Sequence, residues 1–462
     1  MADELEKQKE YINMLEDLLY LRAGEKKPKA FVHTYGCQQN VADSEKIKGM
    51  LIQMGCELTE EKEDADIILF NTCAVREHAE DRVYGNVGAL KALKKKKPSL
   101  IIGLCGCMME QEQVVQKIYK SFPYVSLVFG THVIHKFPEL LYRTVTAGKR
   151  TVERGFDDGQ IYEGLPIHRD GSFKGWLPIM YGCDNFCTYC IVPHVRGRER
   201  SRRPETVLAE AKEMVQAGYK DITLLGQNVN SYGKWLDGDT DFADLLKGVA
   251  DIDGDFWVRF MTSHPKDASK KLIDIMAENP KICNHLHLPF QSGSSNVLSR
   301  MNRRYTREKY LEIANYAKSK IPDLSLTSDV IVGFPGETYE EFQETLSLIR
   351  EVKFTSLFTF IYSPRTGTPA AKYDDPITHA EKAKWMDELL RTQEKIAAER
   401  CAGMVGNKYR VLVEEQAREG VLNARTQNNI VVEIKADTEL IGTFQNVEIT
   451  EARNWILRGK LL

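Results

Sequence analysis

The chain has 462 residues, of which 42% are hydrophobic and 28% charged, and its formal net charge is −3. This is the composition of a folded protein of two to four domains, and it excludes a chain coated in positive charge. The sequence has neither the run of about 18 apolar residues that a membrane span needs nor a secretory leader, so we expect a cytoplasmic protein with no membrane partner.

The first part of the chain predicts a helix followed by an α/β domain. Residues 1–29 have the pattern of a charged amphipathic helix, which could dock on the rest of the chain or on a partner. Over residues 30–150, short apolar runs alternate with helical stretches, which predicts a doubly wound parallel α/β domain. The runs are AFVHTYGC, ADIILFNTC, SLIIGLCGC and YVSLVFG.

A cysteine ends each of the first three runs: Cys37, Cys73 and Cys107. Ligands bind such sheets beyond the carboxyl ends of the strands, and neighbouring strands lie roughly 4.8 Å apart. We therefore expect these thiols, separated by 36 and 34 residues, to converge on one point. The alternative is that they are small buried apolar residues, as free cysteines often are.

The rest of the chain predicts a linker and two further domains. Residues 151–175 are rich in glycine, aspartate and charge, as a linker is. Residues 176–390 contain six strand-like runs separated by helices, which predicts a partial (β/α)6 barrel; a second doubly wound sheet is the alternative. Residues 391–462 predict a helix and then a small antiparallel β-barrel, a shape that often binds nucleic acid. The six runs are WLPIMYGC, DITLLGQNV, FWVRFMTS, ICNHLHLPF, LSLTSDVIVGF and TSLFTFIYS.

The stretch YGCDNFCTYC carries Cys183, Cys187 and Cys190 at the spacing C-x3-C-x2-C. Ten cysteines in a long chain without a leader indicate metal binding or catalysis rather than disulfides. Three thiolates on one loop suit a [4Fe–4S] cluster with one open iron, which can bind a small molecule. The alternative is a zinc knuckle completed by His194.

C-x3-C-x-aromatic-C after the first strand of an α/β barrel resembles the radical S-adenosylmethionine superfamily. The resemblance implies that Cys183, Cys187 and Cys190 hold a cluster whose open iron binds S-adenosylmethionine. It also implies one-electron cleavage of that cofactor to a 5′-deoxyadenosyl radical, with Tyr189 close to the adenine. Where many members have Gly-Gly-Glu, this chain has Gly226-Gln227-Asn228. The other expected cofactor contacts lie in the motifs SHP, HLPFQSGSS and DVIVGFPGET: Ser263, Gln291, Asp329 and Gly333.

The whole arrangement resembles the methylthiotransferase family from Phe31 onward. Its motifs here include TYGCQQNVADSE, NTCAVRE, GCMME, LLGQNVNSYG and YSPRTGTPA, and the first and fourth resemble the MiaB-type branch that acts on tRNA. Gln39 stands where that branch usually has methionine. The resemblance implies a second [4Fe–4S] cluster on Cys37, Cys73 and Cys107, and a TRAM-like C-terminal barrel.

The activity that the resemblance implies is methylthiolation of carbon 2 of N6-dimethylallyladenosine beside the tRNA anticodon. Two molecules of S-adenosylmethionine are consumed, one as methyl donor and one as radical source, and both clusters face one cavity. Hydrogen on such a carbon is beyond polar chemistry, which is why a radical cofactor is needed. The alternatives are the sister reaction on N6-threonylcarbamoyladenosine and a non-catalytic, metal-binding RNA module.

Two arginine clusters, VRGRERSRRP and RMNRRYTR, follow motif segments and suggest a phosphate track. The alternative is a solvated face with ion pairs. The expected partners are the prenylated anticodon stem–loop and an electron donor such as a flavodoxin or ferredoxin, and we expect a monomer. The expected RNA contacts are Arg196, Arg198, Arg202, Arg203, Arg303 and Arg304.

Overall fold

The computed structural model describes residues 2–75, 77–155, 160–453 and 456–462. The chain divides into two compact units: Met1–Asp170 with Tyr181–Asp184 and Ile191–Arg200, and Gly171–Met180 with Asn185–Cys190 and Ser201–Leu462. Three predicted features lie partly outside the described residues: Arg76 of NTCAVRE, residues 156–159 of the linker, and residues 454–455 near the C-terminus.

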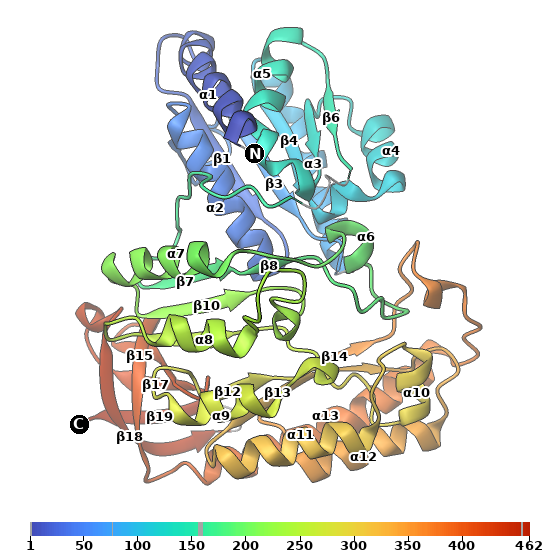
Figure 1. Cartoon of the computed structure of the whole chain (residues 1–462). Coiled ribbons are helices and arrows are strands. Elements are labelled where there is room, and N and C mark those ends of the chain that lie inside the picture. The colour runs from blue at the N-terminus through green and yellow to red at the C-terminus, as the bar shows by residue number, and fades with distance from the viewer. Residues whose placement is uncertain (1, 76, 156–159, 454–455) are drawn as a thin grey trace. The chain divides into compact units, whose positions relative to one another are not determined.

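In the described part of the first unit, six parallel strands form one sheet in the order β2-β1-β3-β4-β5-β6 (Figure 1). β3 and β4 are buried along their whole length, as strands covered on both faces are. The predicted doubly wound domain is confirmed. The strands are β1 (Lys29–Thr34), β2 (Glu57–Leu58), β3 (Ile67–Thr72), β4 (Ile101–Gly106), β5 (Leu127–Phe129) and β6 (Thr151–Glu153).

Helices cover both faces of this sheet. α1, α2 and α5 pack with one set of sheet side chains, and α3 and α4 with the opposite set. Ile12, Leu15 and Leu19 of α1 are buried in the first of these cores, so the N-terminal helix docks on its own unit. The helices are α1 (Ala2–Arg22), α2 (Gln38–Gln53), α3 (Glu77–Lys96), α4 (Glu112–Ser121), α5 (Phe137–Ala147) and α6 (Val192–Arg196), with 3-10 turns η1 (Cys107–Glu110) and η2 (Thr131–Lys136).

The predicted linker of residues 151–175 is shorter than expected. Its start, β6, pairs with β5 and forms the edge of the first sheet. Its end enters β7, the first strand of the second unit. Further on, Pro166 lies against Gly49 of α2 so closely that a Cβ there would be 2.5 Å from the Pro166 carbonyl oxygen. The segment therefore packs on the first unit instead of spanning free space.

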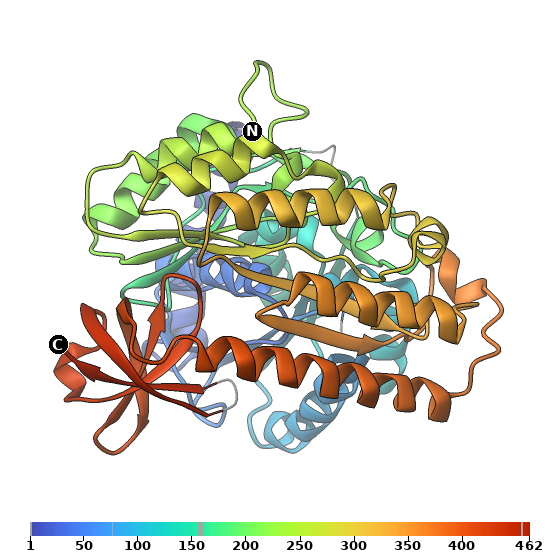
Figure 2. The same cartoon turned by 90° about the horizontal axis from the view of Figure 1, so that it is seen from below.

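The second unit contains two three-stranded parallel sheets, β7-β10-β11 and β12-β13-β14, in its described residues (Figure 2). A parallel bridge between Val258 of β11 and Ile282 leads from the first sheet toward the second. These are the six predicted strands of the partial barrel. They are β7 (Lys174–Pro178), β10 (Asp221–Leu225), β11 (Trp257–Phe260), β12 (His285–His287), β13 (Ser325–Val332) and β14 (Ser356–Ile361). The two-residue strands β8 (Met180–Tyr181) and β9 (Arg200–Ser201) flank the cysteine loop.

The helices of the second unit cover one face of these strands around a large apolar core. α13 runs beside α12 and β14 and continues unbroken across the predicted boundary at residue 390. The helices are α7 (Pro204–Gln216), α8 (Phe242–Ala250), α9 (Lys270–Glu278), α10 (Ser295–Arg300), α11 (Arg307–Lys320), α12 (Tyr339–Val352) and α13 (His379–Ala402). Shorter 3-10 turns are η3 (Val229–Ser231), η4 (Pro265–Asp267), η5 (Pro369–Lys372) and η6 (Thr438–Leu440).

The C-terminal strands close into the predicted barrel, in the order β15-β16-β17-β19-β18. Its own apolar core is fixed to the rest of the unit where Trp257 meets Phe444, with ring centroids 4.7 Å apart. The strands are β15 (Lys408–Arg418), β16 (Val421–Thr426), β17 (Val431–Lys435), β18 (Phe444–Arg453) and β19 (Ile456–Leu461). Across the whole described chain, no helix combines the length and apolar character needed to cross a bilayer.

Candidate functional site

The three strand-end thiols of the first unit lie together. Cys37 caps the start of α2 just beyond β1, Cys73 follows β3, and Cys107 follows β4. These strands are neighbours in the sheet, so their carboxyl ends meet at one edge. Cys37 and Cys107 both raise the pKa of Cys73, and Cys37 raises that of Cys107, so the three thiols are close enough to affect one another's ionisation. The strand ends that carry the three thiols therefore meet at one edge, as the pattern predicts, and a cluster held by all three thiols stays a prediction.

Glycine makes this close approach possible. Gly36 has φ +129°, and a Cβ there would lie 2.5 Å from Cys73 Cβ and 3.1 Å from its Sγ. The backbone beside Cys37 therefore reaches Cys73 because position 36 has no side chain.

A buried polar network holds the loops around these thiols. Asn40 Oδ1 accepts from Cys37 Sγ (3.3 Å), while its Nδ2 donates to Asn71 Oδ1 (3.1 Å) and the Thr72 carbonyl oxygen (3.0 Å). Asn71 in turn donates to the Asn40 carbonyl oxygen (2.8 Å). The backbone N–H of Val75 donates to Cys73 Sγ (3.4 Å), the kind of contact that cluster sulfurs receive.

Arg196 of α6 brings a positive charge to the same thiols. Its Nε lies 3.0 Å from Cys107 Sγ, and its Nη2 lies 2.7 Å from Asp43 Oδ2. Arg196 and Asp43 are both buried, so each offsets the desolvation of the other. A guanidinium beside cysteine sulfurs favours the thiolate, the form that binds metals.

The pKa values of the thiols differ with their surroundings. The hydrogen bond from Cys73 lowers the pKa of Cys37 to about 6, and the same contact raises the pKa of Cys73. Burial raises the pKa of Cys107 to about 11, and Arg196 opposes that rise. Cys37 is exposed whereas Cys73 and Cys107 are buried, so Cys37 is the thiol that meets solvent.

The second cysteine set lies on a loop that the division into units crosses: Cys183 belongs to the first unit, and Cys187 and Cys190 to the second. In the first unit, the Cys183 N–H donates to the Gly197 carbonyl oxygen (3.1 Å). In the second, Arg303 Nη1 lies 3.5 Å from Cys187 Sγ. Thr188 between the second-unit cysteines is anchored through its N–H to the Met301 carbonyl oxygen (3.0 Å).

Most of the predicted cofactor residues of the second unit follow the carboxyl ends of its strands, whereas Asp329 lies within β13. Three of them carry a buried oxygen with no hydrogen-bond partner among the described residues: Asn228 Oδ1, Ser263 Oγ and Gln291 Oε1. A buried acceptor without a donor is costly, and a bound ligand can supply that donor. The amino group and ribose hydroxyls of S-adenosylmethionine are suitable donors, so these residues fit that cofactor.

The remaining predicted residues have less distinctive surroundings. Tyr189 is partly buried, with its ring centroid 6.5 Å from that of Phe334. Asp329 Oδ1 lies 3.6 Å from His287 Nε2. Gly333 has φ +70°, which favours glycine at the turn after β13. A Cβ on Gly226 would lie 2.5 Å from Met180, so this residue is held by packing, and Gln227 next to it is half-buried.

Two residues to which sequence reasoning assigned no role also lie at these strand ends. His264 follows Ser263 and is buried, and burial places its pKa well below the usual range. Its Nδ1 accepts from the Lys266 N–H (3.2 Å), so the proton is on Nε2, which has no partner in the described structure. Glu337 caps the turn after β13. The motif SHP contains His264, and the motif GFPGET contains Glu337.

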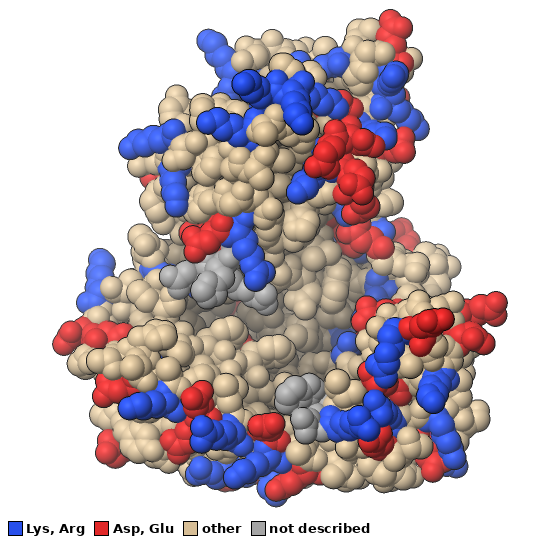
Figure 3. All heavy atoms as spheres, turned by 180° about the vertical axis from the view of Figure 1, so that it is seen from behind, with Lys and Arg blue, Asp and Glu red and all other residues tan. Residues whose placement is uncertain are grey.

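The six predicted RNA contacts separate into two groups. Arg196, Arg202 and Arg303 are buried and donate within the protein. These three are withdrawn as RNA contacts, because a buried guanidinium that already donates internally is not available to a phosphate. Arg203 and Arg304 are exposed, and Arg198 is exposed in an ion pair with Asp184 (2.8 Å). On the face drawn in Figure 3, basic side chains lie among acidic ones.

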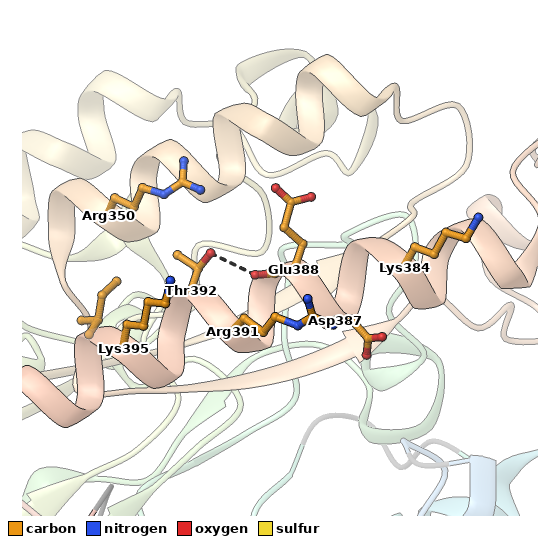
Figure 4. Close-up of a pocket in the computed structure, with 8 residues that line it drawn as sticks. Arg350, Lys384, Asp387, Glu388, Arg391, Thr392 and Lys395 are labelled. Atoms are coloured by element: carbon orange, nitrogen blue, oxygen red, sulfur yellow. Dashed lines mark hydrogen bonds between the residues drawn. The ribbon is translucent and has the colours of Figure 1, made fainter.

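Two other features do not contribute to this site. Among the described residues, no three or more His, Cys, Asp or Glu side chains surround a point suited to one metal ion. A groove of about 620 Å³ between α12 and α13 contains none of the predicted site residues (Figure 4). It is lined by Arg350, Lys384, Asp387, Glu388, Arg391, Thr392, Lys395 and Ile396.

Comparison with known proteins agrees with this geometry. Residues 177–349 match the Radical SAM superfamily, residues 29–130 match Uncharacterized protein family UPF0004, and residues 403–462 match the TRAM domain. The fold resembles the radical S-adenosylmethionine methyltransferase TsrM from Kitasatospora setae (TM-score 0.55, 12% identity, 75% of this chain and 77% of that one). The match over residues 177–349 thus gives the class of protein, the radical S-adenosylmethionine superfamily.

Curated relatives identify the family within this superfamily to which the chain belongs. The tRNA-2-methylthio-N(6)-dimethylallyladenosine synthase of Thermoanaerobacter sp. (strain X514) is 51% identical over 433 residues, 93% of this chain and 92% of that protein. The synthase of Alkaliphilus oremlandii is 49% identical over 459 residues, 99% of this chain and 97% of that protein. The chain belongs to the tRNA-2-methylthio-N(6)-dimethylallyladenosine synthase family.

Proposed function

We propose that this protein replaces the hydrogen on carbon 2 of N6-dimethylallyladenosine at position 37 of tRNA with a methylthio group. The observation that carries the proposal is the convergence of Cys37, Cys73 and Cys107 at three adjacent strand ends, in a chain that also has the Cys183–Cys190 motif. One three-thiol set serves radical generation, and a second serves delivery of sulfur. A single-cluster radical enzyme would need only the loop set.

The cofactors are two [4Fe–4S] clusters and S-adenosylmethionine. Cys183, Cys187 and Cys190 would hold one cluster, and Cys37, Cys73 and Cys107 the other. The cluster on Cys183, Cys187 and Cys190 would supply the one-electron reduction of S-adenosylmethionine, and the cluster on Cys37, Cys73 and Cys107 would supply the sulfur of the methylthio group.

The chain's own residues position and shield these groups. Asn228, Ser263 and Gln291 would present their buried acceptors to S-adenosylmethionine. The family resemblance implies that Tyr189 would lie close to its adenine. The remaining predicted cofactor residues come from the same strands and the turns that follow them: Gly226, Gln227, Asp329 and Gly333. Arg196 and Arg303 each place a buried guanidinium against a cysteine sulfur. Burial of these groups excludes water and oxygen, which would quench a carbon radical.

The RNA is bound by the C-terminal barrel and by exposed arginines. Arg198, Arg203 and Arg304 remain the candidates for phosphate contacts, and binding should weaken steeply with salt. The protein would act in the cytoplasm as a monomer, with a flavodoxin or ferredoxin as electron donor.

The test is anaerobic reconstitution followed by iron analysis and turnover on prenylated anticodon stem–loop. Wild type should bind about eight irons, and Cys187→Ala and Cys73→Ala about four each. Cys187→Ala should form no 5′-deoxyadenosine. The Cys73→Ala variant should still form some 5′-deoxyadenosine, but it should yield no methylthio product. Cys283→Ala, a buried cysteine that packs with Trp257 and Leu412, is the matched control and should bind the full iron.

Three results would reject the proposal. Zinc in place of iron would indicate a metal-binding RNA module. Methylthiolation of a threonylcarbamoyladenosine stem–loop in place of the prenylated one would indicate the sister reaction. Equal iron content in Cys73→Ala and Cys283→Ala would show that Cys73 does not hold a second cluster.

A further inference from the structure

Two large aromatic side chains stand exposed on β14, the last strand of the partial barrel. Phe358 is 50% exposed and Phe360 is 48% exposed. Successive side chains of a strand point to opposite faces, so these two share one face. Leu357, which directly precedes Phe358 and therefore points to the other face, packs against the helix-covered core. Phe358 and Phe360 therefore lie on the face of the strand opposite to the helices.

That face leads to the cofactor residues of the neighbouring strand. Phe358 is paired with Asp329 of β13, and Phe360 with Ile331. The His287 ring meets the Phe358 ring edge-on, with centroids 5.7 Å apart, and His287 Nε2 lies 3.6 Å from Asp329 Oδ1. The aromatic pair thus adjoins polar groups at one edge.

The chain of contacts continues to Gln291. The Gln291 N–H donates to the Asp329 carbonyl oxygen (2.9 Å), and the Ile331 N–H donates to the Gln291 carbonyl oxygen (2.9 Å). Gln291 also carries one of the buried acceptors without a partner. The exposed aromatic surface is therefore continuous, through β13, with the predicted S-adenosylmethionine site.

We propose that Phe358 and Phe360 form the subsite for the substrate's dimethylallyl group, an inference that rests on the proposed function. An exposed apolar surface beside an active site marks ligand contact, and a branched five-carbon alkenyl group leaves water when it packs on two rings. The purine then lies toward His287 and Asp329, where polar partners are present.

Charge also separates the two candidate tRNA substituents. A threonylcarbamoyl group carries a carboxylate, which would lose its water against two phenyl rings and would face the carboxyl group of Asp329. The dimethylallyl group carries no charge and meets neither cost. The subsite therefore selects the alkenyl substituent.

The experiment measures how strongly the reconstituted full-length enzyme prefers a prenylated stem–loop over the same stem–loop with plain adenosine. Dissociation constants from fluorescence anisotropy give the preference, and methylthio product gives KM and kcat. In Phe358→Ala and Phe360→Ala the binding preference should fall by about tenfold or more, as loss of a few methylene contacts does. The KM for the prenylated substrate should rise more than its kcat falls, and Phe358→Leu should restore most of the preference.

Tyr339→Ala is the matched control. Tyr339 is 45% exposed on α12, where its ring packs with Trp385, and its loss should leave the preference unchanged. An unchanged preference in both phenylalanine variants, or an equal loss of affinity for both stem–loops, would overturn the subsite. If wild type formed methylthio product on neither stem–loop, the proposed function would be rejected instead. The binding preference would still test the subsite.

Discussion

The carboxyl group of Glu337 offers a quantitative test of the turn that follows β13. It is buried, and Oε2 accepts the N–H groups of Gly333 (2.7 Å) and Phe334 (3.1 Å). Oε1 is buried without a hydrogen-bond partner in the described residues. Burial raises the pKa of Glu337 to about 7 from an ordinary 4.5, although the two backbone donors lower it. The change to make is Glu337→Gln, which removes the charge and keeps the shape.

The magnitude follows from proton linkage. A difference of about 2.5 pKa units corresponds to about 3 kcal/mol. The folded state binds this proton more tightly than the unfolded state does, so the contribution of Glu337 to the free energy of unfolding is most favourable below pH 4.5. This contribution falls as the pH rises from 4.5 to 7, and above pH 7 the whole cost of burying the ionised carboxylate is present. The amide of the Glu337→Gln variant does not titrate, so the stability of the variant relative to wild type should rise by up to about 3 kcal/mol between pH 4.5 and pH 8.

The assay is urea unfolding of the full chain at several pH values, compared as the difference between variant and wild type. This difference cancels the other groups that titrate. Glu341→Gln, on the helix α12 that follows this turn, is the control. Burial raises the pKa of Glu341, but its hydrogen bonds with Arg300 (2.8 and 3.2 Å) lower that pKa by more. Its variant should be destabilised at pH 8, and this deficit should shrink only below pH 4.5. The same stability difference for Glu337→Gln at pH 5 and pH 8 would refute the reasoning.

Three further changes test the first unit. Arg196→Met leaves the buried Asp43 carboxylate unpaired, so urea unfolding should show a loss of about 3–5 kcal/mol, and adding Asp43→Leu should recover most of it. Gly36→Ala should abolish iron binding at the strand-end thiols, because its Cβ would lie 2.5 Å from Cys73; Gly155→Ala, at a similar φ of +124° with nothing within 4 Å, should bind iron as wild type does. Leu19→Ala should lower unfolding free energy by about 2–5 kcal/mol, since Leu19 fixes α1 in the core; a loss under about 1 kcal/mol would mean that α1 is not held there.

The strand-end thiols were predictable because topology, rather than distance along the chain, brings them together. One βα unit separates each cysteine from the next, and neighbouring parallel strands place their carboxyl ends at one edge. The same reasoning failed for β2 and β6, which have two and three residues. Strands that short have no apolar alternation to recognise, and they form because an existing sheet offers an unpaired edge.

The arginines show where a sequence pattern gives no answer. Charge alone marked Arg196, Arg198, Arg202 and Arg203 alike, yet alternate members of the run are buried and exposed. What buries Arg202 is the Pro178 carbonyl oxygen and the Glu210 carboxylate, which come from other elements. Single-residue chemistry predicts an affinity for anions, but only the tertiary partners decide whether the anion is a phosphate or a neighbouring side chain.

The buried arginines also distinguish the two cysteine sets. Arg196 contacts Cys107 but is neutralised by Asp43, whereas Arg303 contacts Cys187 and is held by uncharged oxygens of Pro289 and Tyr305. Net charge near an iron–sulfur cluster sets its reduction potential, and an uncompensated cation favours the reduced form. The cluster proposed to pass an electron to S-adenosylmethionine is the one on the Cys187 loop. Among the described residues, the guanidinium without an acidic partner therefore lies at the site proposed to take up an electron, and the one paired with Asp43 lies at the site proposed to supply sulfur.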